Sequence, residues 1–515
     1  MNEKPFFHKL FGTKPGDDMQ PKEAIAYSIT GFGQNLICTI IGSYLMMFMT
    51  DAIGFDNNMT LGGVVGTMAV AYLMLATRIF DALNDPIMGS IVDRTRTKWG
   101  KCRPYLKWMA IPIAIITVLC FLPAFKATSG GFAAISVIYI TWSVVYTIAD
   151  VPYWGLSTAM TNNTRIRGNM LTVARLFCTA GAGIVTIGLP VFTANIPKAK
   201  GLMIEEVIDG ASKWVPNPAM LTEYMACLRW IYFVAALIIV VVSVPMFYYG
   251  FKNTKERYTA TEAPPSLKHN LQLLFKNKPL MLIVLSGILG SAKMVYGGAG
   301  GLYFAKYALG NEGMYGLITM LVIPGGLVAS ILVPWFTKKF GKKNTFIYSH
   351  LLGAAAMLVM YFVGYQTKTE LMLCAAALII IGIPQGFSNI MTYAMIGDTV
   401  EYLEWKTGER AEGICFAMQT FINKIGMAAG AFIGLIAYQM TNIFQGNSAT
   451  ITVEATNKLW NILVLSGVIS MFLCVVPMFF YDLTEKRQAQ LVGEIEERKA
   501  EKAAAESNLA SDEAK

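Results

Sequence analysis

The sequence predicts an all-α membrane protein whose twelve spanning helices form two sets of six. Three observations predict this class: the apolar composition, the number of apolar segments of spanning length, and the pattern of basic connections between them. Of the 515 residues, 55% are hydrophobic and only 15% are charged. A soluble domain carries about 25% charged residues. The mean hydropathy of +0.48 agrees with a chain that lies mostly in lipid.

Segments of spanning length recur along the whole chain. A spanning helix needs about 20 apolar residues, because it rises about 1.5 Å per residue and must cross about 30 Å of hydrocarbon. Such segments occupy residues 24–50, 61–91, 105–125, 132–158, 169–192 and 224–251, then 280–308, 313–336, 345–363, 371–395, 413–440 and 459–481. An even number of crossings places both ends of the chain on one side of the membrane.

Basic residues indicate which side that is, since Lys and Arg accumulate in cytoplasmic loops. The second connection carries Arg94, Arg96, Lys98, Lys101 and Arg103, and the fourth, sixth and eighth are also basic. The first connection has no Lys or Arg. We therefore expect a multi-pass protein of the bacterial inner membrane with both termini in the cytoplasm. This topology accounts for the net charge of +9 without a nucleic-acid partner.

A long basic connection containing Pro264 and Pro265 divides the chain near its middle. The two sides share a short repeat, Trp-Gly-Lys at 99–101 after the second segment and Phe-Gly-Lys at 340–342 after the eighth. We therefore predict two six-helix bundles (1–251 and 280–482), a cytoplasmic central loop (252–279) and a charged cytoplasmic tail (483–515) that forms a solvated helix and frays into disorder.

The sequence gives little support to an enzymatic or an ATP-driven function. The eight cysteines show no paired spacing that would indicate zinc or disulfides, and no GxxxxGK[ST] motif is present. His8, His269 and His350 lie in or near cytoplasmic connections, and no serine or cysteine nucleophile is visibly paired with a base. We expect a protein that is not an enzyme and needs no cofactor other than a coupling cation.

Charged side chains in the second segment indicate a cation site, because ionisable groups at bilayer depth are costly and usually functional. Arg78, Asp81 and Asp85 fall at i, i+3 and i+7, with Asn84 beside them, on one side of a helix. Two carboxylates and an amide oxygen suit a small hard cation. The alternative is a structural ion pair between Arg78 and one aspartate, which would not require the second acid.

The fourth segment carries a candidate sugar site. Tyr146, Asp150 and Trp154 lie at i, i+4 and i+8 on one helical face, with the Thr147 hydroxyl nearby. A carboxylate can accept hydrogen bonds from sugar hydroxyls, and aromatic rings can cover the apolar face of a pyranose. An aromatic belt at the membrane interface would explain Trp154 but not Asp150.

Polar residues of other segments lie at a similar depth. Gln34 and Asn35 are in the first segment, Arg175 in the fifth and Lys424 in the eleventh, and we expect all of them to be buried. At about 1.5 Å per residue, these polar groups lie about 9 to 16 Å from the cytoplasmic ends of their helices. An alternating-access carrier holds its cargo in such a layer near the midplane.

Four motifs carry a resemblance to a known family. They are DALNDPIMGSIVDRTRTKWGKCRPY at 81–105, YTIADVPYWGL at 146–156, GDTVEYLEWKTGERAEG at 397–413 and QTFINKIG at 419–426. In these motifs, and nearly throughout the chain up to about Arg498, the sequence resembles the glycoside-pentoside-hexuronide:cation symporters, the family of melibiose permease. The resemblance implies the major facilitator superfamily fold and symport of a sugar with sodium or protons.

The resemblance also implies roles for individual residues. It implies a cation site of Asp81, Asn84, Asp85 and Thr147. It implies sugar contacts from Asp150, Trp154 and Arg175, with Lys424 close to both sites. It also implies a cytoplasmic gate that closes in the outward-open state, formed by charge pairs among Arg167, Asp398, Glu401 and Arg410. Arg167 follows the fourth helix, and Asp398 and Glu401 lie at the end of the tenth. These are equivalent places in the two halves.

One departure from the family pattern affects the substrate. Where melibiose carriers have a Lys-Asp pair in the first helix, this chain has Gln34-Asn35 and so lacks one sugar-binding carboxylate. A β-glycoside, a xyloside or a short oligosaccharide is therefore at least as good a candidate as melibiose. A sodium-coupled carrier for lysolipid or another organic solute on the same fold is the alternative. The expected partners are the sugar, the coupling cation and the bilayer, with a monomer as the functional unit.

Overall fold

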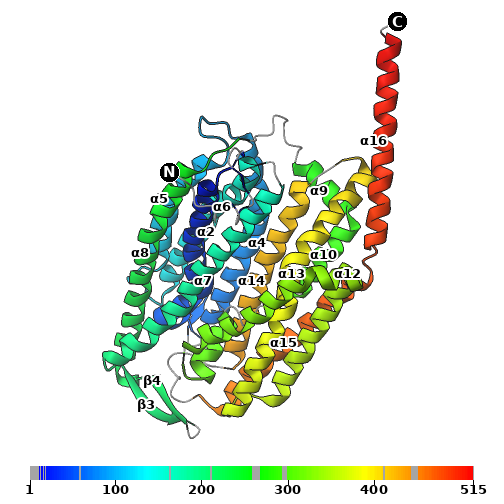
Figure 1. Cartoon of the computed structure of the whole chain (residues 1–515). Coiled ribbons are helices and arrows are strands. Elements are labelled where there is room, and N and C mark those ends of the chain that lie inside the picture. The colour runs from blue at the N-terminus through cyan, green and yellow to red at the C-terminus, as the bar shows by residue number, and fades with distance from the viewer. Residues whose placement is uncertain are drawn as a thin grey trace. The chain divides into compact units, whose positions relative to one another are not determined.

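The computed structural model describes residues 8, 11, 13–14, 17, 19–56, 59–161, 164–208, 211–257, 267–292, 299–311, 313–409, 412–441 and 451–513 (Figure 1). These residues are helical apart from loops and two antiparallel hairpins. The second hairpin lies in the connection between the fifth and sixth predicted segments, where only a loop is expected from the sequence.

The elements up to the middle of the chain are α2 (Pro21–Thr39), η1 (Ile40–Tyr44), α3 (Leu45–Met47), η2 (Phe48–Ile53), β1 (Thr60–Leu61), β2 (Val64–Val65), α4 (Gly66–Arg94), α5 (Arg103–Cys120), α6 (Ser129–Met160), α7 (Thr164–Ala199), β3 (Met203–Ile208), β4 (Ala211–Pro216), η3 (Pro218–Met220) and α8 (Leu221–Asn253). Strand β1 pairs with β2, and β3 pairs with β4 from Met203 opposite Pro216 to Ile208 opposite Ala211.

The later elements are α9 (Leu267–Lys276), α10 (Lys278–Leu289), α11 (Ala299–Tyr303), η5 (Phe304–Ala308), α12 (Gly313–Val363), α13 (Lys368–Thr407), α14 (Glu412–Met440), α15 (Val453–Phe479) and α16 (Glu485–Glu513). Helix α12 is two spanning helices joined at Gly341, whose φ of 77° breaks the helical path. The eighth and ninth predicted segments therefore form separate helices on either side of this residue.

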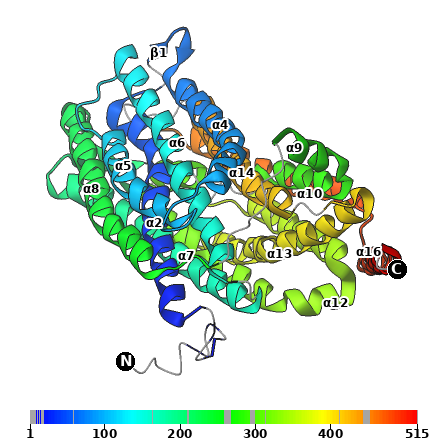
Figure 2. The same cartoon turned by 90° about the horizontal axis from the view of Figure 1, so that it is seen from above.

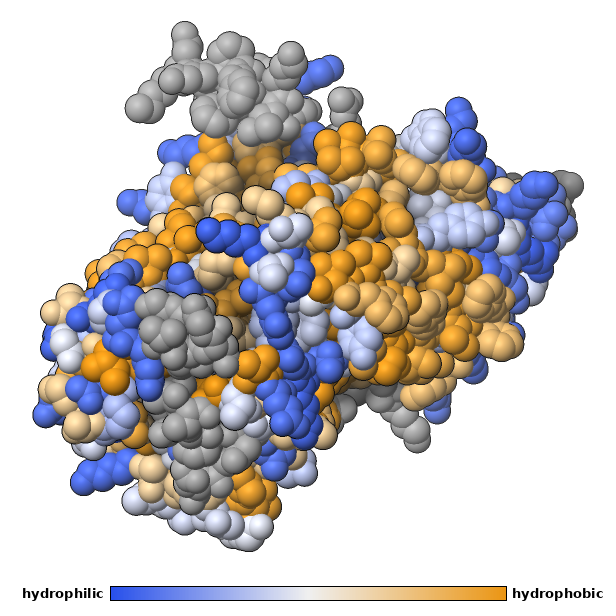
Figure 3. Space-filling view, turned by 90° about the horizontal axis from the view of Figure 1, so that it is seen from below, coloured by the Kyte–Doolittle hydropathy of each residue, from blue (hydrophilic) through white to orange (hydrophobic). Residues whose placement is uncertain are grey.

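Ten helices within the described ranges are long and apolar enough to cross a membrane. The other two predicted segments are also helical where they are described. The second predicted segment corresponds to α4, whose charged residues lower its hydropathy. The seventh predicted segment corresponds to α10, α11 and η5. Large apolar side chains such as Ile331 and Phe362 are 78% and 80% exposed, as expected for a surface that lipid covers. Figure 3 shows hydrophobic residues spread over much of the face in view. The predicted class, a helical membrane protein, is confirmed.

The chain packs into two compact units. The first comprises Met1–Pro264, Val295–Thr319 and Ala428–Leu463; the second comprises Pro265–Met294, Met320–Met427 and Val464–Lys515. Helices α12, α14 and α15 thus contribute to both units. In the first unit α2 packs against α7 and α8, α5 against α6 and α8, and α4 against α6 (Figure 2).

Small residues bring α12 and α13 together in the second unit. A Cβ added at Gly382 would lie 2.0 Å from the carbonyl oxygen of Val322, and one at Gly386 would lie 2.1 Å from that of Gly326. Glycines spaced four residues apart allow such close crossings of membrane helices. This contact fixes the position of α13, which carries several of the polar side chains discussed below.

The repeated Trp-Gly-Lys and Phe-Gly-Lys motifs form equivalent loops. Gly100 and Gly341 adopt φ values of 105° and 77°, a conformation that favours glycine. A carboxylate accepts a hydrogen bond from the backbone N–H of the following lysine in each loop: Glu256, after α8, at 2.8 Å, and Glu485, after α15, at 2.5 Å. In each half of the chain, an acid that follows the sixth spanning helix of that half therefore holds the loop. We call these contacts the glutamate clamps.

The charged tail packs against the protein over its first turns. Leu491 and Ile495 of α16 are buried, and α16 lies along α13. Trp405 donates its indole N–H to Glu494 at 2.5 Å, and Arg498 donates to the Trp405 carbonyl at 2.8 Å. The expectation of a wholly solvated, frayed helix is therefore wrong for this stretch, because the tail contains apolar residues at helical spacing.

Candidate functional site

Asp150 is the centre of a polar site inside the first unit. Its side chain lies on α6 and is 8% exposed. Its Oδ1 atom accepts from the Gln34 amide of α2 at 2.5 Å and from the Trp154 indole N–H at 3.1 Å. Trp154 lies one helical turn beyond Asp150, so the local i, i+4 geometry makes this second bond. The indole therefore belongs to the polar site rather than to an interfacial aromatic belt.

Gln34 also presents an acceptor. Its side chain is 1% exposed, and its amide nitrogen lies 3.4 Å from the Tyr146 hydroxyl as well as near Asp150. Its carbonyl oxygen is buried without a hydrogen-bond partner among the described residues. A buried acceptor left unpaired costs about 1–3 kcal/mol, so a ligand hydroxyl placed here would recover that energy.

Arg175 of α7 completes this group but is not buried as expected. Its guanidinium lies 5.1 Å from the centre of the Trp154 ring, within cation–π range. The side chain is nevertheless exposed. Asn35 differs as well: it is half-buried, and its amide donates to the Gly31 carbonyl at 3.0 Å rather than to Asp150.

Asp81 is held between α4 and α6. It is 3% exposed, Ser143 of α6 donates to its Oδ1 atom, and the Arg78 guanidinium lies 3.6 Å from its Oδ2 atom. Sequence reasoning missed Ser143, although it lies four residues before Thr147 and seven before Asp150 on the same face of α6. The predicted alternative of an Arg78–Asp81 ion pair is thus present in the structure.

The other predicted cation ligands lie on the same two helices, α4 and α6. The Thr147 hydroxyl is buried without a partner in the described part of the chain, one turn from Ser143. Asn84 and Asp85 are half-buried on α4. No cluster of three His, Cys, Asp or Glu side chains suited to a metal occurs within the described ranges. A cation here would therefore rely on carboxylate, amide and hydroxyl oxygens.

Two of the predicted gate residues, both acids, have partners within their own unit. Asp398 accepts from Lys342 at 2.5 Å, and Glu401 accepts from Gln488 of α16 at 2.6 Å. Arg167 is half-buried near the start of α7, and Arg410 lies outside the described residues. Lys424 is half-buried on α14, in the second unit.

Sequence reasoning also missed a buried polar cluster in the first unit. Asp51, at the end of the first spanning segment, is fully buried. Its carboxylate accepts hydrogen bonds from Lys306 of η5 at 2.6 Å and from the Tyr307 hydroxyl at 2.9 Å. The Tyr438 hydroxyl of α14 lies 3.4 Å from the same carboxylate, and its ring stacks on Tyr303 at 4.3 Å. The cluster joins three segments that are distant in sequence.

Acidic side chains buried within spanning helices are typical of membrane transport proteins. The chain belongs to the MFS/sugar transport protein family, which it matches over residues 26–485. The major facilitator fold and the glycoside-pentoside-hexuronide:cation symporter relationship inferred from the four motifs are therefore confirmed, and the family is one of transporters rather than enzymes.

Curated relatives and solved structures agree with this assignment. The chain is 29% identical over 486 residues to the isoprimeverose transporter of Lactiplantibacillus pentosus, covering 93% of this chain and 92% of that protein. It is 28% identical to the glucuronide carrier protein homolog of Escherichia coli strain K12, covering 92% and 95%. A D-xylose–proton symporter has the same fold, with a TM-score of 0.56, 12% identity and coverage of 88% and 96%.

Proposed function

We propose that the chain couples the entry of a sugar or glycoside to the inward movement of sodium or protons by alternating access. The observation that carries this proposal is the buried Gln34–Asp150–Trp154 group, in which a carboxylate and an unpaired amide oxygen can accept from sugar hydroxyls. The sugar-carrier relatives support the same substrate class.

The position of the cation site suggests how coupling arises. Ser143 donates to Asp81, and Thr147 and Asp150 follow within the next two turns of the same helix, α6. A cation bound by Asp81, Asn84, Asp85 and Thr147 would therefore fix the α6 segment that presents Asp150. Binding at one site then changes affinity at the other by the same factor in both directions.

The basic even-numbered connections support a topology with both termini in the cytoplasm. The functional unit in this proposal is a monomer. The polar lining around Asp150 favours a polyol over a lysolipid.

Transport in proteoliposomes tests this function. With the purified carrier, we expect labelled isoprimeverose or a related xyloside or glycoside to accumulate above its external concentration under an inward gradient of sodium or of protons. Accumulation should cease when an ionophore collapses that gradient, and protein-free vesicles serve as the control. Gradient-driven uptake of lysolipid without uptake of any glycoside in the panel would contradict the proposal.

We also propose the gate, in which Asp398 and Glu401 exchange Lys342 and Gln488 for Arg167 and Arg410 when the cytoplasmic mouth closes. Replacing both acids by their amides should shift the carrier toward inward-open forms and slow net transport, while sugar affinity within each state is unchanged. Partly exposed pairs contribute about 1 kcal/mol each, so the double substitution should change the populations of the two states several-fold.

Spin labels at the exposed positions Thr158 and Lys338 would report this shift as a change in their distance distribution. Glu454→Gln, at an exposed acid in the first turn of α15, is the matched control. An unchanged distribution in the double variant would exclude the gate.

A further inference from the structure

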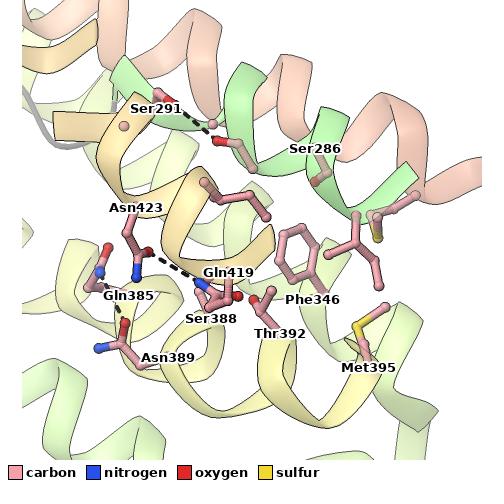
Figure 4. Close-up of a pocket in the computed structure, with 16 residues that line it drawn as sticks. Ser286, Ser291, Phe346, Gln385, Ser388, Asn389, Thr392, Met395, Gln419 and Asn423 are labelled. Atoms are coloured by element: carbon pink, nitrogen blue, oxygen red, sulfur yellow. Dashed lines mark hydrogen bonds between the residues drawn. The ribbon is translucent and has the colours of Figure 1, made fainter. Parts of the chain in front are cut away.

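A groove on the surface of the first unit has a lining unlike that of the polar pocket in the second. Side-chain amides, those of Gln385, Asn389, Gln419 and Asn423, line the pocket of the second unit (Figure 4). The groove is instead lined mostly by apolar side chains of α2, α7 and α8 and has a volume of about 620 Å³. Pockets that hold small molecules enclose about 300–1,000 Å³. The groove is therefore large enough for a ligand, and its lining suits a hydrocarbon.

The packing of three helices forms this groove. Helices α7 and α8 both pack along α2 but make far less contact with each other. Phe32 and Leu36 of α2 line the space that is left between them. Large apolar side chains of α7 and α8 line it as well and are at least 41% exposed: Ile184, Phe192, Trp230, Val234, Ile238 and Val242. Exposed apolar side chains on spanning helices contact lipid, so the groove is open to acyl chains.

A lysine gives the groove one polar end. Lys200 directly follows α7, is exposed, and is the only charged residue among the described residues that line the groove. Cys227, near the start of α8, lies beside it in the lining. The nearby Lys198 has a different position, with its ammonium 3.7 Å from the centre of the Trp214 ring in β4. The groove thus presents a single positive charge at the end where α7 leaves the membrane.

The groove is longer than one leaflet of the bilayer is deep. Its lining on α7 extends from Ile184 to Lys200, which corresponds to about 24 Å of helix. One leaflet supplies about half of the hydrocarbon core, or about 15 Å. An acyl chain that enters beside Lys200 can therefore lie in the groove over the whole depth of its leaflet.

The apolar lining alone does not select one lipid over another. An acyl chain that enters the groove leaves surroundings that are just as apolar, so it gains packing but little hydrophobic free energy. A lipid phosphate beside Lys200 adds a charge-assisted contact. A zwitterionic lipid carries an ammonium group that offsets its phosphate, whereas an anionic lipid does not. Selectivity should therefore depend on Lys200 and favour a lipid with net negative charge.

We propose that this groove is a binding site for an anionic phospholipid, with one acyl chain between α7 and α8 and the phosphate at Lys200. With both termini in the cytoplasm, this lipid belongs to the outer leaflet. It packs against Leu36, two residues beyond Gln34 on α2, and so supports the helix that presents Gln34 to Asp150. The inference does not depend on the proposed sugar transport.

Quenching of Trp230 fluorescence in the full-length carrier in detergent tests the inference. The Trp230 signal is the difference between each protein and the same protein with Trp230→Phe. The probes are phosphatidylglycerol and phosphatidylcholine with identical brominated acyl chains. In the wild type, the anionic lipid should reach half-maximal quenching at a concentration about fivefold lower than the zwitterionic lipid. Lys200→Gln should remove this preference, whereas Lys126→Gln, at an exposed lysine before α6, should retain it.

Gly188→Leu tests the groove itself. A Cβ added at Gly188 would meet no neighbouring group within 4 Å, so the leucine side chain fits and occupies the groove. It should raise the half-quenching concentration of the anionic lipid by about fivefold or more. Gly183→Leu is the matched control, because a Cβ there also meets open space but Gly183 does not line the groove. Thermal unfolding at the wild-type temperature shows that both variants are folded.

Equal half-quenching concentrations of the two lipids in the wild type would indicate ordinary bilayer contact and overturn the inference. Unchanged quenching in Gly188→Leu would overturn it as well. Light scattering that shows a dimer for the wild type and a monomer for Gly188→Leu would assign the groove to a second copy of the chain instead. None of these outcomes bears on whether the protein transports a sugar.

Discussion

Replacing Asp150 by alanine is expected to weaken sugar binding at least about 100-fold, because hydrogen bonds to a charged group contribute about 1.5–3 kcal/mol each and a sugar would make more than one. The substitution also leaves the Gln34 amide and the Trp154 indole N–H without their shared acceptor. Calorimetry with the best substrate of the transport panel measures the change directly.

Glu223→Ala removes an exposed carboxylate at the start of α8 and should leave affinity unchanged. Trp154→Phe keeps the ring and removes only one donor to Asp150, so we expect a smaller loss than in Asp150→Ala. A change below threefold in Asp150→Ala would assign Asp150 a structural role alone.

The second large effect concerns coupling. Asp81→Asn should abolish uphill accumulation in proteoliposomes, because the neutral amide no longer attracts the cation, while exchange of sugar across the membrane continues. The expected readout is an internal sugar concentration that rises only to the external one under a full cation gradient. Gradient-driven accumulation equal to that of the wild type would remove Asp81 from the cation site.

Loss of the Asp81 charge leaves Arg78 buried without its ion-pair partner, and this alone can destabilise the protein by about 3–5 kcal/mol. The double variant Arg78→Gln/Asp81→Asn removes both charges and serves as the control for folding. It should recover thermal stability and sugar exchange but not accumulation. Recovery of accumulation would show that the pair is structural.

The sequence predicted most of the helical architecture, because spanning length and hydropathy are properties of single segments. It also placed Asp150 and Trp154 on one face of a helix, and in the structure the two side chains form a hydrogen bond. The bond from Gln34 to Asp150 could not be predicted, since it joins residues 116 positions apart and depends on how α2 packs against α6. Asp51 and Lys306 were missed for the same reason.

Other features that were not predicted do have a local pattern in the sequence that indicates them. Leu491 and Ile495 are one helical turn apart in the charged tail and indicate a packed face. The stretches MIEEVI and ASKWVP are short and rich in β-branched or aromatic residues, as the β3–β4 hairpin requires. The exposure of Arg175 had no such signal, because depth along a helix does not specify which way a side chain faces.

The glutamate clamps also bear on the order in which the protein is made. Chains fold from the N-terminus during synthesis, and each folding unit forms when its last contributing residue is available. Glu256 follows α8 directly, so the Gly100 loop can close while the ribosome is still translating the second half. The Gly341 loop must wait for Glu485, which follows α15. The second loop therefore closes later in synthesis than the first.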